Sequence, residues 1–153
     1  MPDTSETAPD FTLPRTGGDN TTLSALRPGA VVLFFYPRDD TSGCTKEAVA
    51  FSTLKDQFDA AGVTVMGISK DSLASHEKFA SKHALTVPLL SDEHADVCEA
   101  YGVWAEKSMY GKKYFGIERS TFLIDGEGRI ARVWRKVKVP GHAEEVLDAV
   151  KAL

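Results

Sequence analysis

Residues 31–36 form an unbroken apolar run, and this run constrains the fold more than any other part of the chain. A strand that is apolar at every position is buried on both of its faces. Residues 63–69 form a second, mostly apolar run of strand length. Strands of this kind occur where helices cover both sides of a sheet, so the sequence predicts an α/β protein with a central sheet.

Helical and extended patterns alternate along the rest of the chain. Apolar residues recur at three- and four-residue spacing over residues 44–61, and Gly62 ends this predicted helix. Residues 8–13 and 21–26 flank a glycine-containing turn, which predicts an N-terminal β-hairpin. Further helices are expected from a cap at Asp71 or Ser72 to about His83, over residues 93–101 and over residues 142–153, and further strands over residues 88–91, 121–125 and 130–134.

This order places a β-α-β unit before a hairpin and a closing helix, and a thioredoxin-like fold has that order. We therefore expect a thioredoxin-like α/β fold with a mixed central sheet, flanked by helices and extended by the N-terminal hairpin. The chain has 153 residues and contains no repeat, low-complexity tract or linker. Residues 1–153 are accordingly expected to form a single domain.

The charge and the cysteine content narrow the classes of function. The formal net charge is −4, which argues against nucleic acid as the main partner because phosphate binding needs clustered cations. The one basic stretch, residues 129–138, fits the solvated side of an edge strand. No apolar run approaches the ~20 residues that span a bilayer, no secretory signal is visible at the N-terminus, and two cysteines make no disulfide framework. These features predict a cytoplasmic protein without a nucleic-acid or membrane partner.

Cys44 lies where the predicted strand over residues 31–36 leads into the predicted helix. In the first turn of a helix, backbone N–H groups lack intrahelical partners and the helix dipole is positive. Both features favour a thiolate over a thiol. Two interpretations are open: a small buried core residue, as free cysteines usually are, or a nucleophile at neutral pH.

Three neighbours of Cys44 favour the reactive interpretation. Gly43 leaves the backbone beside the sulfur bare, so a small molecule can approach. Thr41 is the expected N-cap, with its hydroxyl directed toward the backbone and the sulfur of the first turn. Pro37 stiffens the strand exit and donates no hydrogen bond, which fits the wall of a pocket.

Pro37, Thr41 and Cys44 form a P-x-x-x-T-x-x-C pattern. This pattern resembles that of the peroxiredoxins, which are thiol-dependent peroxidases of thioredoxin-like fold. The surrounding sequence resembles more narrowly the branch called bacterioferritin comigratory protein or peroxiredoxin Q. The resemblance runs from about residue 8 to the C-terminus and is carried by residues 35–41, 44–48, 67–72, 90–92, 100–104 and 116–122.

The resemblance implies an enzyme that reduces hydrogen peroxide and organic hydroperoxides without a metal, haem or flavin cofactor. Cys44 would attack one peroxide oxygen in line and become a sulfenic acid. The resemblance also implies that the Thr41 hydroxyl, the Cys44 N–H and the Arg119 guanidinium stabilise the breaking O–O bond. Glu47, one turn after Cys44, either pairs with Arg119 or another cation and keeps it aimed, or is an ordinary first-turn glutamate.

Recycling of the sulfenic acid is where this sequence departs from the common pattern of the branch. Many members carry a second cysteine at the position of Val49, and others carry it in the segment of residues 78–80, but neither is a cysteine here. Cys98 is the only other thiol. It is either a packed core residue or the residue that resolves Cys44, and a disulfide would require the first turn around Cys44 to unwind. If Cys98 does not serve, this is a one-cysteine peroxidase recycled by thioredoxin, a glutaredoxin-type donor or small thiols.

Several further expectations follow from the sequence. A thioredoxin-like redox sensor or binding module, without sustained turnover, is the competing class of function, and a structural or chaperone-like role would not depend on Cys44.

His76 and His83 lack the cysteine or carboxylate spacing of a zinc site and are expected to be exposed. Residues 108–116 are rich in glycine, lysine and aromatic residues and are expected to form a loop at the pocket entrance. The resemblance implies a monomer or weak dimer.

Overall fold

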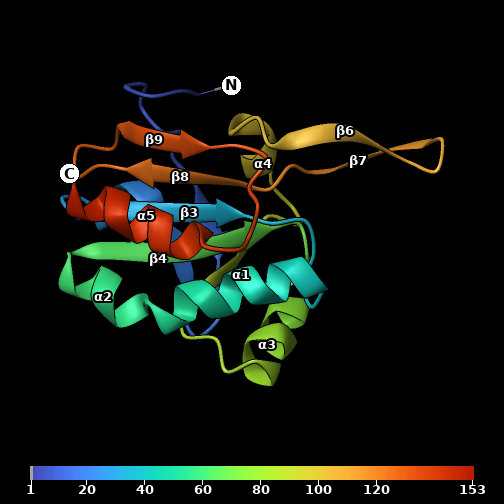
Figure 1. Ribbon diagram of the computed structural model, residues 1–153, viewed down its shortest axis with the longest axis horizontal. Coiled ribbons are helices and arrows are strands. Elements are labelled where there is room, and N and C mark those ends of the chain that lie inside the picture. Colours follow the sequence, from blue (N-terminus) through green and yellow to red (C-terminus); the bar gives the residue numbers. More distant parts are fainter. Residues whose placement is uncertain (1) are drawn as a thin grey trace.

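A five-stranded mixed sheet forms the centre of the computed structural model, which describes residues 2–153 (Figure 1). In sheet order its strands are β5 (Leu89–Ser91), β4 (Val63–Ser69), β3 (Ala30–Phe35), β8 (Ser120–Ile124) and β9 (Ile130–Trp134). β4 is parallel to both β3 and β5, whereas β8 is antiparallel to both β3 and β9. The predicted mixed sheet is therefore confirmed.

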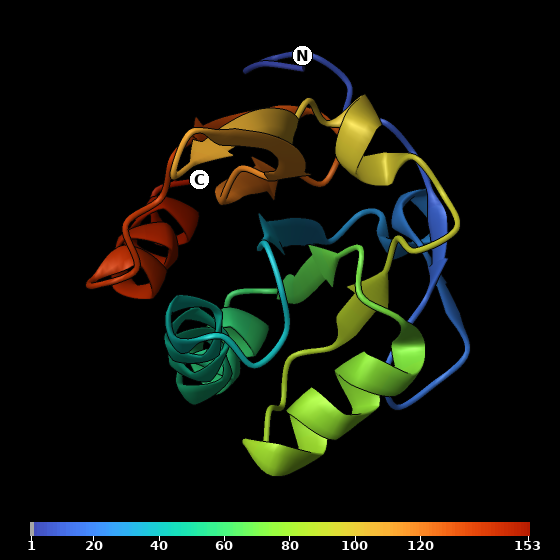
Figure 2. The ribbon, with the colours of Figure 1, turned by 90° about the vertical axis from the view of Figure 1, so that its right-hand side faces the viewer.

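Helices cover both faces of this sheet, but unequally. One face carries α1 (Ser42–Thr53), α2 (Lys55–Ala60), α3 (Leu73–Lys82) and α5 (His142–Lys151), whose buried side chains join a single cluster. The other face carries α4 (Val97–Ala100) and the N-terminal segment. Figure 2 shows α1 and α5 on one side of the sheet and the N-terminal segment on the opposite side.

Successive residues of β3 point to opposite faces of the sheet, and this alternation divides the core into two layers. Val32 and Phe34 pack in what we call the α1 layer, with buried side chains of α1, α2, α3 and α5. Val31, Leu33 and Phe35 pack in what we call the α4 layer, with buried side chains of α4 and the N-terminal segment. Every one of these five side chains is almost completely buried, which explains the unbroken apolar run.

The predicted N-terminal hairpin is present, and both of its strands are shorter than expected. β1 (Thr12–Pro14) pairs antiparallel with β2 (Asn20–Thr22), and the 3₁₀ helix η1 (Leu23–Leu26) follows directly. The Asp10 carboxylate accepts hydrogen bonds from Ser24 N at 2.9 Å and from Ser24 Oγ at 2.8 Å. Such bonds stabilise a turn in place of a continued strand.

The helix predicted over residues 44–61 is interrupted at Leu54, where φ is −94° and ψ is 1°. Side chains just before the interruption bond to the backbone. Thr53 Oγ1 donates to Val49 O at 2.9 Å, and Ser52 Oγ accepts from Thr86 N at 3.0 Å. A bond from a threonine hydroxyl to the carbonyl four residues earlier often bends a helix, and α1 ends at Thr53.

The helix predicted over residues 93–101 is also shorter than expected. The carboxylate of the buried Asp92 accepts hydrogen bonds from Val97 N at 3.1 Å and from Cys98 N at 2.8 Å. Because this carboxylate satisfies the first N–H groups of the helix, α4 begins at Val97 and residues 93–96 form a turn.

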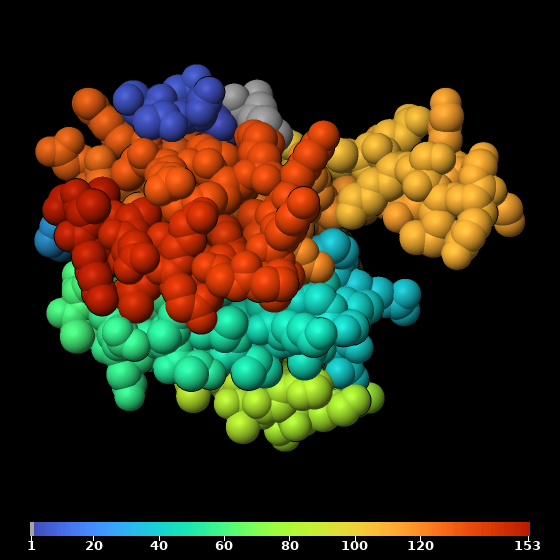
Figure 3. All heavy atoms as spheres, in the orientation of Figure 1, coloured from blue at the N-terminus to red at the C-terminus, as the bar shows by residue number. Residues whose placement is uncertain are grey.

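Residues 108–116 form most of a β-hairpin, so the prediction of a loop was wrong. β6 (Trp104–Met109) pairs antiparallel with β7 (Lys112–Ile117), and the turn between them consists of Tyr110 at φ 53° and Gly111 at φ 77°. Two residues with positive φ make the tight turn that hairpins favour. The hairpin projects from the body of the protein (Figures 1 and 3). Because nearly all of its side chains are exposed or half-buried, the alternation that reveals a strand in sequence is missing.

The basic stretch lies where the sequence predicted it. β9 is an edge strand of the central sheet, and the cationic side chains of Arg132, Arg135, Lys136 and Lys138 are exposed. Among residues 2–153, no helix combines the length and the apolar character that crossing a bilayer requires.

Candidate active site

Cys44 is the third residue of α1, and the loop that leads to it begins directly after β3. Arg119 directly precedes β8, the antiparallel neighbour of β3. Ser120 pairs with Phe35 in this register, so the start of β8 lies beside the end of β3. The sheet thus brings Arg119 to the first turn of α1, although the two residues are 75 positions apart.

The Arg119 guanidinium links the thiol to a carboxylate. Its Nη2 donates to Cys44 Sγ at 3.3 Å, and its Nη1 donates to Glu47 Oε1 at 2.7 Å. A Cβ atom on Gly43 would lie 3.2 Å from Arg119 Nη2, so a side chain at this position would crowd the guanidinium. Cys44 is only 1% exposed, which makes the charged contact strong because water screens it little.

Glu47 is a buried partner of Arg119 and not a solvated first-turn glutamate. Its side chain is 1% exposed, and its Oε2 has no hydrogen-bond partner among the residues described. Burial raises the pKa of Glu47 to about 7 and outweighs the attraction of Arg119. Burial lowers the pKa of Arg119, but the charges of Glu47 and Cys44 outweigh that effect and raise it overall. The sequence left open whether Glu47 pairs with Arg119, and in the structure the two side chains form an ion pair.

Thr41 occupies the predicted N-cap position of α1, but its hydroxyl does not cap the helix. Thr41 Oγ1 donates to Arg38 O at 3.0 Å, within the loop before the helix. The Thr41 carbonyl accepts from Thr45 N at 2.8 Å and so forms the first helical hydrogen bond. The expectation that the hydroxyl bonds to the backbone of the first turn was therefore wrong, because the loop carbonyl competes for it.

Pro37 and a lysine of the projecting hairpin line a cavity of about 390 Å³, and neither Cys44 nor Arg119 belongs to its lining. The lysine is Lys107, whose Nζ donates to Ile117 O. Burial lowers the pKa of Lys107, and the nearby positive charge of Arg119 lowers it further. Sequence reasoning missed Lys107 because the hairpin that carries it was expected to be a loop. Aromatic side chains of Trp104, Tyr114 and Phe115 complete this wall of the cavity.

Cys98 lies in the α4 layer, whereas Cys44 lies in the α1 layer, so the central sheet separates the two thiols. Cys98 is completely buried, and its thiol faces the negatively charged Asp92. Burial raises the pKa of this thiol, and the Asp92 carboxylate raises it further. Both cysteines are free, and the structure does not bring them together.

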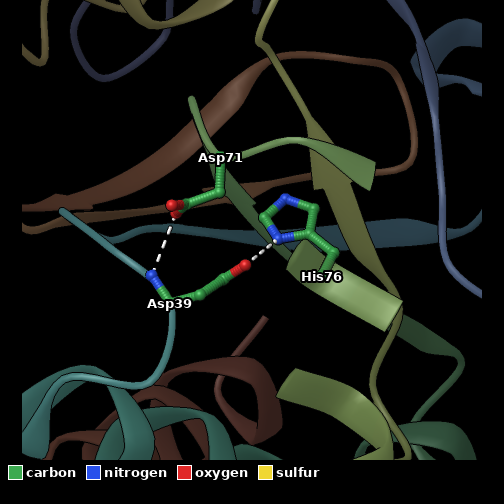
Figure 4. Close-up of side chains that lie close together, drawn as sticks. All are labelled: Asp39, Asp71 and His76. Atoms are coloured by element: carbon green, nitrogen blue, oxygen red, sulfur yellow. Dashed lines mark hydrogen bonds and ion pairs between the residues drawn. The ribbon is translucent and has the colours of Figure 1, made fainter. Parts of the chain in front are cut away.

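His76 is completely buried, so the prediction that it is exposed was wrong. Its Nδ1 lies 2.7 Å from Asp39 Oδ2, and Asp71 bonds to the backbone N of Asp39 at 2.9 Å (Figure 4). Each of these three residues has one oxygen or nitrogen atom that could bind a metal, and these atoms lie within 4.8 Å of one another. Their spacing in sequence gave no sign of this proximity. Because Asp39 and His76 are fully engaged in hydrogen bonds, we treat the group as a hydrogen-bond network. His83 is partly exposed and contacts Asp40 at 2.8 Å.

Comparison with known proteins identifies the family of this chain. The AhpC/TSA family profile matches residues 4–133. The chain belongs to this family. Its relatives include the putative peroxiredoxin bcp of Coxiella burnetii, 54% identical over 92% of this chain and 93% of that protein. They also include the peroxiredoxin Bcp of Bacillus subtilis, 45% identical over 94% and 92% of the two chains.

Solved structures of peroxiredoxin Q share the architecture. The Xanthomonas campestris protein aligns with a TM-score of 0.88 and 48% identity over 93% of this chain and 90% of that chain. The Xylella fastidiosa protein aligns with a TM-score of 0.94 and 44% identity over 99% and 97%. The resemblance seen in the sequence and the thioredoxin-like fold are both confirmed. As a peroxiredoxin, this protein is a thiol-dependent peroxidase.

Proposed function

We propose that this peroxiredoxin reduces hydrogen peroxide and small organic hydroperoxides at Cys44 and is recycled by an external thiol. The observation that carries the proposal is the contact of 3.3 Å between Arg119 Nη2 and Cys44 Sγ. A guanidinium at this distance stabilises a thiolate and can also hold a peroxide oxygen. One related protein, from Xanthomonas campestris, is described as having alkyl peroxide reduction activity.

The reaction proposed at Cys44 transfers one oxygen atom. The thiolate attacks the terminal oxygen of ROOH, the O–O bond breaks, and the departing RO⁻ takes up a proton and leaves as ROH. Cys44 is then a sulfenic acid. Negative charge develops on both oxygens in the transition state, so donors aimed at them lower the barrier. We assign this role to Arg119, to the Cys44 N–H and to the Thr41 hydroxyl after it leaves Arg38 O. We propose that Pro37, which lines a neighbouring cavity, also borders the path of the peroxide to Cys44.

We propose further that Cys98 does not resolve the sulfenic acid. It is completely buried in the opposite core layer from Cys44, and burial, together with the Asp92 carboxylate, keeps its thiol protonated. A disulfide needs Cα atoms about 5.5 Å apart, which would require both layers to open. The reductant is therefore a thioredoxin, a glutaredoxin-type protein or a small thiol. Two free cysteines suit a reducing compartment, and we propose the cytoplasm and a monomeric or weakly dimeric state.

Replacement of the proposed nucleophile tests this function. Cys44→Ser should abolish peroxide consumption with dithiothreitol as reductant, because a serine hydroxyl is not ionised at neutral pH. Peroxide loss is followed colorimetrically over many turnovers. Retained turnover in Cys44→Ser would refute the assignment. A parent protein that consumes one equivalent of peroxide and then stops in excess thiol would indicate a redox sensor.

A further inference from the structure

The sulfur of Cys44 has to become accessible once in every catalytic cycle, if the proposed function is correct. Its side chain is 1% exposed, packs in the α1 layer and contacts Arg119 Nη2. A peroxide is small, but an external thiol carries a substituent and must approach sulfur along the line of the S–O bond that it breaks. The first turn of α1, or the loop that leads into it, therefore has to open before the reductant can attack.

The loop of residues 37–41 is fastened to the body of the protein mainly through Asp39. Its Oδ1 accepts a hydrogen bond from Tyr36 Oη at 2.7 Å, and its Oδ2 accepts one from Ser75 Oγ at 2.8 Å. Its backbone N–H donates to Asp71 Oδ2 at 2.9 Å. Asp39 is only 8% exposed, so these bonds are shielded from water.

His76 completes the attachment from inside the protein. Its Nε2 lies 2.9 Å from Leu90 O, which only accepts, so this nitrogen carries a proton. Its Nδ1 lies 2.7 Å from Asp39 Oδ2 (Figure 4). The ring is thus fixed between the loop and β5. Removing either partner would leave a buried polar group without its bond.

These contacts connect the loop to α3, the helix that carries Ser75 and His76. The next loop residue, Asp40, has φ 56° and contacts Lys82 Nζ at 2.7 Å near the end of the same helix. That second contact is exposed and correspondingly weak. Asp39 lies only five residues before Cys44. The position of the first turn of α1 therefore depends on whether the buried Asp39 contacts are made.

We propose that Asp39 and His76 are positioning residues that form a clamp on the loop before Cys44. With the clamp closed, Cys44 and Arg119 are arranged for peroxide. With the clamp open, a thiol R′SH attacks the sulfenic sulfur, the S–O bond breaks, water leaves and a mixed disulfide forms; a second R′SH then releases Cys44 and R′SSR′. The clamp therefore acts oppositely on the two half-reactions. It also favours overoxidation, because a closed sulfenate can take a second oxygen from ROOH and become a sulfinate, releasing ROH.

The test measures each half-reaction separately by rapid quenching and mass spectrometry. We expect His76→Gln and Asp39→Asn to form sulfenic acid about 10-fold more slowly, and to lose it to 2-mercaptoethanol about 5-fold faster, than the parent. Less sulfinic acid should accumulate in excess peroxide. Ser75→Ala, which removes one bond to Asp39, should shift both rates in the same directions by about twofold. The matched control is Asp10→Asn, because Asp10 also accepts from a serine N–H and hydroxyl but lies in the N-terminal segment.

Opposite changes in the two half-reactions support the clamp, since a general loss of stability would not speed one of them. Rates that change in the same sense, or that do not change in folded variants, would overturn it. If His76→Gln and Asp39→Asn do not fold, Ser75→Ala tests the clamp, again by whether the two half-reaction rates change in opposite directions. The proposed function itself fails only if the parent protein does not react with peroxide at Cys44, so the two failures are distinguishable.

Discussion

The two cysteines of this protein make an informative comparison. Cys44 is 1% exposed and Cys98 is 0% exposed, and both lie in the first turn of a helix. The side chains that bond to the two thiols differ in the sign of their charge. Arg119 Nη2 donates to Cys44 Sγ, whereas the Asp92 carboxylate raises the pKa of Cys98, after burial itself. Burial and helix position are shared, so we propose that the charge of the bonded side chain makes Cys44 the nucleophile and leaves Cys98 unreactive.

Removing the positive charge beside Cys44 should slow its reaction with peroxide more than the loss of any other neighbouring group. We expect Arg119→Met to lower the rate of sulfenic acid formation by about 100-fold or more, because both the thiolate and the transition state lose a charged donor. Single-turnover kinetics with hydrogen peroxide measure this rate. Arg132→Met is the matched control, since Arg132 is an exposed arginine on the edge strand. Equal rates in the parent and in Arg119→Met would end the distinction between the two cysteines.

Removing the Thr41 hydroxyl should have the next largest effect on the reaction of Cys44 with peroxide. We expect Thr41→Val to slow sulfenic acid formation by about 10-fold, because one donor to the peroxide oxygens is lost without a change in charge. The same single-turnover measurement applies. Thr53→Val is the control, because the Thr53 hydroxyl also donates to a backbone carbonyl but at the far end of α1. A rate in Thr41→Val that matches the control would remove Thr41 from the proposed mechanism.

Glu47 should affect stability and rate in opposite directions. We expect Glu47→Gln to slow sulfenic acid formation by about fivefold, because Arg119 is held less firmly. The pKa of Glu47 is raised from 4.5 to about 7 by burial, so the folded protein retains a proton that the unfolded chain loses. Its contribution to stability is complete below about pH 4.5 and is lost as the pH rises through about 7.

Glu47→Gln should therefore raise the free energy of unfolding at pH 8 by up to about 3 kcal/mol and have little effect near pH 4.5. Urea unfolding at the two pH values measures the difference from the parent. Glu127→Gln, a change at an exposed glutamate in the turn between β8 and β9, should show no such pH dependence. A gain in stability that is the same at both pH values would contradict the account of Glu47.

Replacing Cys98 should have the smallest effect on peroxide turnover. Cys98→Ser is expected to keep its steady-state turnover with small thiols within about twofold of the parent, because an external thiol reduces Cys44 directly. Peroxide consumption with dithiothreitol measures it. Loss of turnover, together with a Cys44–Cys98 disulfide in the oxidised parent, would show that the two cysteines act together after all.

The strands buried on both faces could be predicted from sequence, whereas the projecting hairpin could not. The apolar runs gave β3 and β4, and β9 begins and ends at the predicted residues, Ile130 and Trp134. The β6–β7 hairpin was missed because a projecting hairpin has no core-facing side and so no apolar alternation. The first turn of α1 was predicted to contain Cys44 because an apolar run led into it.

The contacts of the site were less predictable, because they depend on pairing between distant strands. The resemblance named Arg119, but its contacts with Cys44 and Glu47 follow from the β3–β8 register. His76 was expected to be exposed because its partners come from other elements, Asp39 after β3 and Leu90 on β5. A local pattern carries no signal for such partners, so only the fold reveals that His76 is buried.

Mass spectrometry of the intact and digested protein after one equivalent of hydrogen peroxide shows which of the two cysteines reacts. We expect one added oxygen atom on the intact protein, a dimedone adduct on Cys44 when the sulfenic acid is trapped before digestion, and an unmodified Cys98. Oxidation of Cys98 in preference to Cys44, or a protein that remains unmodified, would contradict the claim that the Arg119 guanidinium makes Cys44 the reactive thiol.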